Sequence, residues 1–399
     1  MVMNITLDEK PSSTPSLFGS LQTFFTNPHA RAVGLVFTTE SLLLGGWVAH
    51  IPHVKEKLNL TDAGLGMVLF AMPVGLLLMN PFSGWIIARL GAARTCFLSA
   101  LALCLSTLIP INAPNIALMA VGLFFVGLSA ALLNVAMNTS AADVEREHNI
   151  LIMSSCHGMW SLGGMIGSML AGILIALKVS PSLHMLGMTV ALLVLTFSLR
   201  PILATIPAQP PTESSAAFVR PNTMLFLMII IGLAVAMGEG AALDWSAVYL
   251  RESAGASSQL AALGFGCFSL AMTTGRFMGD AIIPRLGTKR ILFFGSLVAA
   301  AGLLLAITVP TPLVVLAGFA LLGAGCSLTA PILYAASMRV PGIPAATGLA
   351  TFATFSFVGF LAGPPSIGLV AEAYGLAYGL GLVVVMLLLS AVFSRIVKL

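Results

Sequence analysis

The chain has 399 residues, of which 58% are hydrophobic and only 8% are charged, and its formal net charge is +4. Soluble domains carry roughly a quarter charged residues, and no water-soluble fold of this length hides so much apolar surface. The composition therefore excludes a soluble enzyme or binding protein and predicts a chain whose solvent is the lipid bilayer. The basic residues are spread over many loops, so the positive charge does not indicate nucleic-acid binding.

The first 31 residues are expected to form an N-terminal tail without a removable signal peptide, because no charged, apolar and small-residue cleavage pattern is present. Leucines and phenylalanines between Leu17 and Phe25 fall at helical spacing before Asn27-Pro28. This pattern predicts either a short helix along the bilayer surface or a disordered tail.

Runs of about twenty apolar residues, long enough to cross a bilayer as helices, recur along the rest of the chain. They predict an all-α polytopic membrane protein with twelve transmembrane helices and no other soluble domain. The expected spans are 32–52, 63–87, 95–111, 115–141, 152–177, 183–200, 223–250, 260–282, 290–309, 312–338, 346–370 and 374–396.

The distribution of basic residues orients these spans. With both termini in the cytoplasm, 13 of the 18 lysines and arginines lie on the cytoplasmic side, Arg276 lies within a span, and four lie outside. The positive-inside rule requires this asymmetry, and it supports an even number of spans. The four outer basic residues are Lys55, Lys57, Lys178 and Arg251.

The chain divides into two similar halves. The least hydrophobic internal stretch lies near its middle, so we expect residues 32–200 and 223–399 to form two six-helix bundles joined by a cytoplasmic linker at 201–222. Internal repeats of this kind are typical of secondary carriers. Positions that match at an offset near 198 residues are Trp47 with Trp245, Gly66 with Gly264, Arg89-Leu90-Gly91 with Arg285-Leu286-Gly287, and Gly127 with Gly325.

The loop after the second span resembles the signature of the major facilitator superfamily. It runs from Gly84 through Arg89 and Gly91 to Arg94, with Ala88 where aspartate is usual. The matching loop of the second half, Gly275 to Gly287, is closer to the pattern and carries Asp280.

Within that superfamily the chain is similar to the YbjJ-like bacterial inner-membrane permeases, which are related to the fucose permease group. The resemblance implies the superfamily fold, with two pseudo-symmetric bundles, in a multi-pass inner-membrane transporter that uses protons. The motifs that carry it are Val144-Glu145-Arg146-Glu147, His157-Gly158 with Ser161-Leu162-Gly163, Gly238-Glu239-Gly240 with Asp244-Trp245, and Gly363-Pro364-Pro365.

Two carboxyl groups within predicted spans are the proton-coupling candidates. Glu40 lies near the middle of the first span, and Glu239 lies between two glycines in the seventh. An ionised carboxylate there costs about 2.5–3.5 kcal/mol, so each needs a partner, a water-filled cavity or a bound proton. The alternative for either glutamate is a protonated structural residue that is hydrogen-bonded to a neighbouring helix. His157 is a third candidate, as a proton relay or an interhelical hydrogen-bond partner.

Other polar or aromatic residues of the spans are candidates for binding the solute. Asn134 and Asn138 share one helix face, where amides bind a solute or join helices. Asp244 binds solute or pairs with Arg251, whereas Trp47 and Trp245 frame the cavity mouth or belong to the aromatic belt at the bilayer surface.

Charged residues at the expected cytoplasmic ends of the spans are the gating candidates. Arg276 and Asp280 are one helical turn apart and are expected to neutralise each other. The acidic end of the fourth span is expected to lie opposite the basic loop after the second. The resemblance implies that these residues form a gate and helix-end contacts, and a solvated helix cap is the alternative. The full set is Arg89, Arg94, Glu145, Arg146, Arg276, Asp280 and Arg285.

The leading prediction is a carrier that alternates between two openings and brings in a small polar solute, such as a sugar, together with protons. Efflux of amphipathic or cationic compounds is the alternative in the same class, and a solute sensor with a transporter fold is the alternative from another class. No phosphate-binding loop, nucleophile triad or metal cluster is apparent, so the sequence predicts no enzyme activity, metal or cofactor. The expected partners are lipid, solute and protons, and the chain is expected to act as a monomer.

Overall fold

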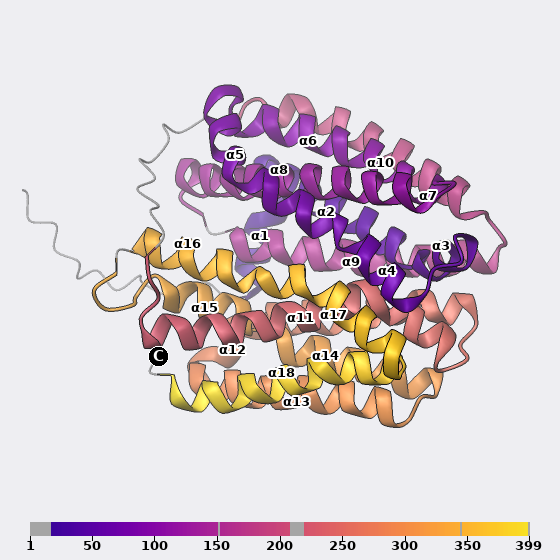
Figure 1. Ribbon diagram of the computed structural model, residues 1–399. Helices are drawn as coiled ribbons and strands as arrows, with labels where there is room; N and C mark the ends of the chain where they lie inside the picture. The colour runs from indigo at the N-terminus through magenta and orange to yellow at the C-terminus, as the bar shows by residue number, and fades with distance from the viewer. Residues whose placement is uncertain (1–16, 151, 208–218, 344, 398–399) are drawn as a thin grey trace, which may run out of the picture.

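The computed structural model describes residues 17–150, 152–207, 219–343 and 345–397, and every regular element in them is a helix (Figure 1). The first half contains α1 (Leu17–Thr26), α2 (Pro28–Val48), α3 (Ile51–Lys57), α4 (Asp62–Leu69), α5 (Ala71–Leu90), α6 (Ala92–Ser106), α7 (Leu108–Asn112), α8 (Ile116–His148), α9 (Met153–Ala176) and α10 (Pro181–Leu203). The second half contains α11 (Thr223–Glu252), α12 (Ser258–Leu286), α13 (Thr288–Thr308), α14 (Pro312–Cys326), α15 (Thr329–Ser337), α16 (Ala345–Ser356), α17 (Val358–Tyr374) and α18 (Leu376–Ile396).

Twelve of these segments are long and apolar enough to cross a membrane. Eleven are continuous or gently bent, and the twelfth is formed by α2 and α3, which meet at a 44° bend. The predicted all-α, twelve-span fold is therefore confirmed. The main difference lies at the helix ends, since α8 continues to His148 through the charged residues that we expected to follow the span.

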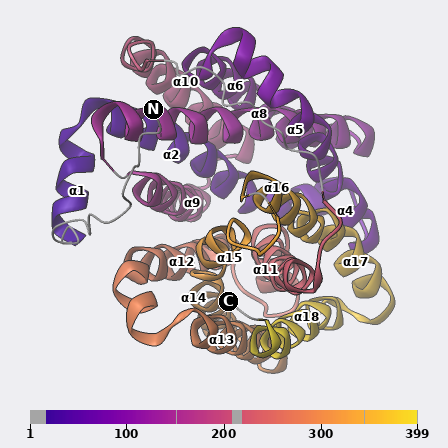
Figure 2. The same cartoon turned by 90° about the vertical axis from the view of Figure 1, so that its left-hand side faces the viewer.

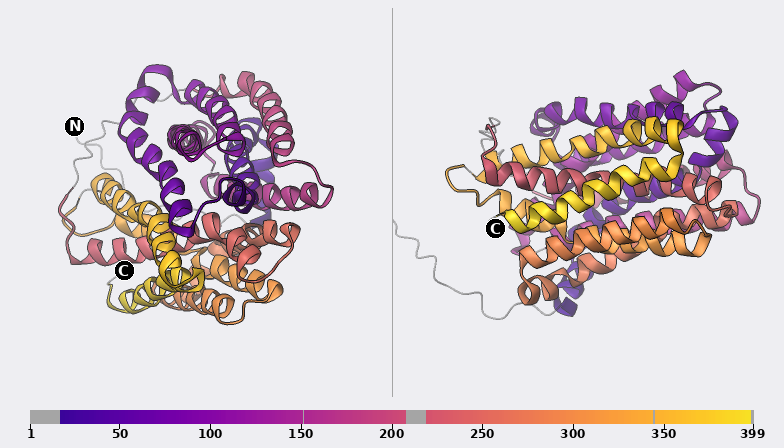
Figure 3. Two further views of the ribbon diagram at one scale, coloured as in Figure 1. Left: turned by 45° about the vertical axis from the view of Figure 1, so that its right-hand side comes forward. Right: turned by 60° about the horizontal axis from the view of Figure 1, so that its bottom comes forward.

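The spans form two helical bundles that lie against each other. In the first bundle α2 packs along α9 and α5 along α8, and in the second α13 packs along α14 and α18. The bundles meet along α9 with α12 and along α4 with α17. Figures 1 and 3 show the two groups of helices lying against each other. Of the predicted linker at 201–222, residues 208–218 lie outside the described residues, and the exact bundle boundaries stay a prediction.

The molecule has two ends that differ in structure, and we name them by their connections. The linker end is where α10 finishes, α11 begins and α18 finishes, and Figure 2 looks onto it. The far end carries the turns from α3 to α4, from α9 to α10 and from α11 to α12.

The repeated Arg-Leu-Gly sequence forms the same turn in both halves. Gly91 ends α5 with φ 80° and ψ 152°, and Gly287 ends α12 with φ 78° and ψ 148°. Positive φ values favour glycine because it lacks a Cβ atom. Each glycine is followed directly by the next helix, so this part of the predicted repeat is also a structural repeat.

We predicted either a short helix or a disordered tail before the first span, and the described part of the tail is a helix. The helix α1 ends at Thr26, and Asn27 then caps α2 by accepting hydrogen bonds from the amides of His29 and Ala30 at 2.9 and 3.0 Å. Phe24 of α1 is buried beside Gly34, so this helix packs onto α2. Residues 1–16 lie outside the described residues.

Candidate functional site

Glu239 in α11 forms an ion pair inside the second bundle. Its Oε1 lies 3.8 Å from the guanidinium of Arg276 in α12, and the two side chains are 20% and 15% exposed. Arg276 also donates a 2.9 Å hydrogen bond to the hydroxyl of Ser161, which belongs to α9 of the first bundle. One guanidinium therefore connects the coupling candidate to the opposite bundle.

Glu239 was not predicted as the ion-pair partner of Arg276; we expected Asp280 there. Asp280 follows one turn later in α12, but its side chain lies outside the described residues, so that pairing stays a prediction. Glu239 and Arg276 lie on different helices and share no sequence motif. Their pairing depends on how α11 and α12 are rotated against each other, which spacing in the sequence does not reveal.

Glu40, the other interior acid, has a different environment. It is 5% exposed in α2, and Trp160 of α9 is a hydrogen-bond partner of its carboxyl group. Its Oε2 is buried without a hydrogen-bond partner in the described structure. Among the described residues no hydrogen bond links Glu40 with Glu239, so the two acids lie in separate environments.

Small and polar residues of α9 face α12. Ser161 accepts from Arg276, Gly164 packs beside Phe265, and Ser168 donates to the backbone carbonyl of Ala262. Small residues permit this close contact, and their hydroxyl groups supply polar links between the bundles.

Other predicted polar residues in the spans are accessible rather than buried. The His157 ring is exposed and packs edge-on against Phe37 with a centroid separation of 5.3 Å. In α8 the amide of Asn138 donates to the Asn134 carbonyl at 2.8 Å, and the Asn134 side chain is exposed. These side chains lie in the linker-end half of their helices and are free to contact a solute.

A small aromatic pocket beside Glu239 was missed by the sequence analysis. Its volume is about 100 Å³, and Tyr334 and Phe352 meet edge to face across it at 5.4 Å. Phe357 and Phe360 are stacked, also with centroids 5.4 Å apart. The pocket places ring faces next to a carboxyl group, which suits a solute that is apolar on one side and polar or cationic on the other.

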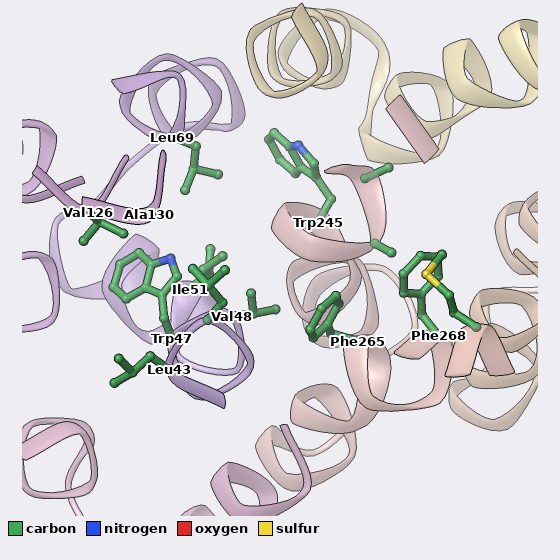
Figure 4. Packing of buried hydrophobic residues seen from close by; sticks show 14 of the residues in the cluster. Leu43, Trp47, Val48, Ile51, Leu69, Val126, Ala130, Trp245, Phe265 and Phe268 are labelled. Carbon is green, nitrogen blue, oxygen red and sulfur yellow. The ribbon is translucent and has the colours of Figure 1, made fainter. Parts of the chain in front are cut away.

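The paired tryptophans lie in the packed interior. Trp47 is 4% exposed and Trp245 is completely buried (Figure 4). A lipid-facing aromatic belt requires exposed rings, so that interpretation is wrong for both. Among the described residues the carboxyl group of Asp244, half-buried in α11, has no hydrogen bond or ion pair. The predicted partner Arg251 instead lies 3.8 Å from Glu56.

A lysine at the far end joins the two bundles. The Lys55 ammonium lies 2.6 Å from Asp62 in the same bundle and 2.6 Å from Glu252 in α11. The Lys55 side chain is only 9% exposed, and it donates to both oxygens of Glu252. Lys55 was expected only as an outer basic residue, and its contact with Glu252, which joins the two bundles at the far end, was not predicted.

At the linker end the predicted gating residues make local contacts. Arg89 stacks 4.2 Å above the Trp85 ring of its own helix, and Arg94 and Arg285 are exposed. In α8, Arg146 pairs with Asp143 at 2.6 Å. These arginines stay within their own bundles in this conformation.

Glu145 makes a helix-end contact that favours the capping interpretation. Its Oε1 accepts hydrogen bonds from the backbone amides of Ile152 and Met153, at 2.7 and 2.8 Å, where α9 begins. The first amides of a helix have no partner within the helix, and a carboxylate also complements the helix dipole.

Removal of this cap provides a stability prediction. We expect Glu145→Ala to lower the free energy of unfolding by about 1 kcal/mol, because two amides of α9 lose their acceptor. Glu145→Gln, which keeps one acceptor oxygen, should lose about half as much. Thermal unfolding of the purified variants measures this difference, and equal stability of Glu145→Ala and the parent protein would contradict the capping role.

The described features define a multi-pass membrane protein with a polar, partly accessible interior between two helical bundles, which is the construction of a solute carrier. Among the residues described, no three histidine, cysteine, aspartate or glutamate side chains are grouped to hold a metal ion. The sequence model of the Major Facilitator Superfamily matches residues 32–353, and the chain belongs to this superfamily.

Relatives extend over nearly the whole chain. An MFS-type transporter of Yersinia pestis is 32% identical over 365 residues, covering 91% of this chain and 94% of the relative. The transporter y4wD of Sinorhizobium fredii is 33% identical over 370 residues, covering 92% and 98%. The chain is therefore a membrane transporter that carries a small solute by secondary transport.

Two solved structures have a similar fold. A bacterial homologue of the human lysosomal transporter Spinster, in an inward-facing and occupied conformation, has a TM-score of 0.68 at 15% identity, covering 97% of both chains. The E. coli fucose:proton symporter FucP has a TM-score of 0.60 at 17% identity, covering 93% of this chain and 98% of that one. At these identities the likeness concerns the fold alone.

Proposed function

We propose that the protein takes up a small polar solute, such as a sugar, by proton-coupled symport across the bacterial inner membrane. The observation that carries this proposal is the contact of Arg276 with both Glu239 and Ser161. It connects an interior acid of one bundle with a hydroxyl group of the other.

The coupling follows from electrostatics. Ionised Glu239 attracts the Arg276 guanidinium, and this attraction is strong where water is scarce. Protonation removes the attraction, so that Ser161 alone still holds Arg276 and the guanidinium can turn toward the solute. A proton on Glu239 thus changes a contact between the bundles, which a carrier needs if proton binding and the change of opening are to be linked.

We further propose that both termini face the cytoplasm, as the distribution of basic residues supports. The Lys55 contacts then close the outer side, while Asn134 and His157 are accessible from the inner side. Cysteines introduced at Ser253 and Arg290, one at each end, test this orientation. A membrane-impermeant thiol reagent added to whole cells should label only the cysteine at 253, and labelling at 290 alone would reverse the orientation.

Efflux of amphipathic or cationic compounds is a second candidate function. The aromatic pocket beside Glu239 favours it, because a cation is attracted both to ring faces and to the carboxylate. Such a cation would compete with Arg276 for Glu239, whereas a neutral polar solute would not.

Purified protein in liposomes separates these functions. The panel contains sugars, amino acids, organic acids and lipophilic cations, each tested under a proton gradient of either direction. Symport predicts that a polar solute moves in the same direction as the protons. Proton-coupled efflux predicts that a lipophilic cation moves in the opposite direction. If compounds bind but none moves under any gradient, the protein is a sensor and the carrier proposal is wrong.

A further inference from the structure

The far end contains a cavity that the transport mechanism above does not use. Its volume is about 280 Å³, larger than the pocket beside Glu239. It lies between the bundles, among α3, the turn from α9 to α10, and the start of α12. The polar and charged residues of its lining are His50, His53, Glu56, Lys178, Ser180, Arg251 and Ser258.

The charges around this cavity favour an anion. Lys178 and Arg251 face one carboxylate, Glu56, so the lining carries an excess positive charge even with neutral histidines. Arg251 is engaged only in part, by Glu56 at 3.8 Å and by the Ala256 carbonyl at 3.2 Å. The Lys178 ammonium has no ion pair or hydrogen bond among the described residues, and the side chain is exposed.

Backbone groups strengthen the same preference. The long helices α10 and α12 begin at the cavity, where Pro181 and Ser258 are part of its lining. Both helices direct the positive end of the helix dipole toward the cavity, although Pro181 has no N–H group and Ser180 and Ser257 already accept hydrogen bonds from Leu183 and Leu260. These two helices belong to different bundles, as do Lys178 and Arg251, so an anion between them would contact both bundles.

The inner wall of the cavity is polar and held in place. His50 is 1% exposed and its Nε2 lies 2.7 Å from Nδ1 of His184, which is itself 3% exposed. The other nitrogen of His184 is buried without a hydrogen-bond partner in the described structure. The pair fixes the His50 ring behind the cavity, so the wall needs little reorganisation on binding.

We propose that this cavity is a second binding site, separate from the Glu239 region, that takes a small organic monocarboxylate between Lys178 and Arg251. The bound carboxylate joins the turn from α9 to α10 with the end of α11. It therefore stabilises the conformation in which the far end is closed. This inference does not depend on the identity of the transported solute or on proton coupling.

Calorimetric titration of the purified full chain with benzoate tests the proposal, and benzamide serves as a neutral probe of nearly the same shape. We expect benzoate to bind and benzamide to bind at least about tenfold more weakly, because only the carboxylate forms charge-assisted contacts. Lys178→Gln and Arg251→Gln should each weaken benzoate binding by about tenfold or more.

The matched control is Lys57→Gln, which removes a far-end lysine that bonds to the Ile111 carbonyl and does not line the cavity. It should leave benzoate affinity unchanged. Lys178 lies in an exposed turn, so we expect Lys178→Gln to fold. This variant therefore decides the test even if Arg251→Gln fails to fold. The proposal is overturned if benzamide binds as tightly as benzoate, if Lys178→Gln keeps full affinity, or if Lys57→Gln weakens binding equally.

Discussion

Glu239→Gln is expected to abolish uphill accumulation of the solute in liposomes while leaving solute exchange intact. Glutamine keeps the shape and hydrogen-bonding capacity of the side chain but cannot bind and release a proton. The ion pair with Arg276 is lost, so a proton gradient no longer biases the carrier, whereas bound solute still moves in both directions. The measurement compares gradient-driven uptake with counterflow for a solute identified in the panel above.

Glu40→Gln is the matched control for this experiment. Glu40 is also an interior glutamate, but in the described structure it has no cationic partner. We expect its variant to keep gradient-driven accumulation. Normal accumulation by Glu239→Gln, or its loss only in Glu40→Gln, would assign proton coupling to Glu40 or to another residue.

Lys55→Met is expected to shift the carrier strongly toward a far-end-open conformation. Without the lysine, Asp62 of the same bundle and Glu252 of the opposite bundle both lose the cation that they contact. Breaking a buried pair costs about 3–5 kcal/mol, but Glu252 is 36% exposed and screened, so we expect about 2 kcal/mol. That corresponds to a roughly thirty-fold change in the ratio of the two conformations.

Spin labels on the two bundles measure this shift. Cysteines at Pro114 and Ser253 lie in far-end turns of opposite bundles, in a variant whose native cysteines are replaced by alanine. Pulsed electron paramagnetic resonance should report longer distances in Lys55→Met. Lys57→Met removes a nearby lysine outside the ion-pair cluster and should leave the distances unchanged. Identical distance distributions in Lys55→Met and the parent would show that Lys55 does not hold the far end closed.

The fold was largely predictable because the bilayer imposes simple rules on sequence. A crossing helix needs a long apolar run, and the recurring runs gave the twelve spans. The bend between α2 and α3 was not predicted, although Pro52 follows the break directly. The predicted end of the fourth span was seven residues short, because a helix can continue into charged residues beyond the apolar run.

Individual residues of the candidate site could be predicted from the sequence, but their arrangement in space could not. A carboxyl group in an apolar run is conspicuous, and this identified Glu40 and Glu239. The pairing of Glu239 with Arg276 was missed because Arg276 belongs to another helix, and the contact between them depends on tertiary packing. The aromatic pocket was missed for the same reason, since Tyr334 and Phe352 are ordinary residues of apolar spans until α15 and α16 bring them together.

The buried tryptophans show a further limit of sequence reasoning. Trp47 and Trp245 lie near one end of their spans, where tryptophan usually anchors a helix at the bilayer surface. In the folded chain both face the packed interior. Depth in the membrane is readable from position along a span, but the direction in which a side chain points depends on helix rotation.

The central claim is that solute and proton move together, and the pH of weakly buffered liposomes tests it most directly. With no starting gradient, addition of the transported solute outside should make the external medium more alkaline, because protons enter with the solute. The change should disappear in Glu239→Gln while exchange of the solute persists. Solute entry into liposomes without any change in external pH would contradict proton symport.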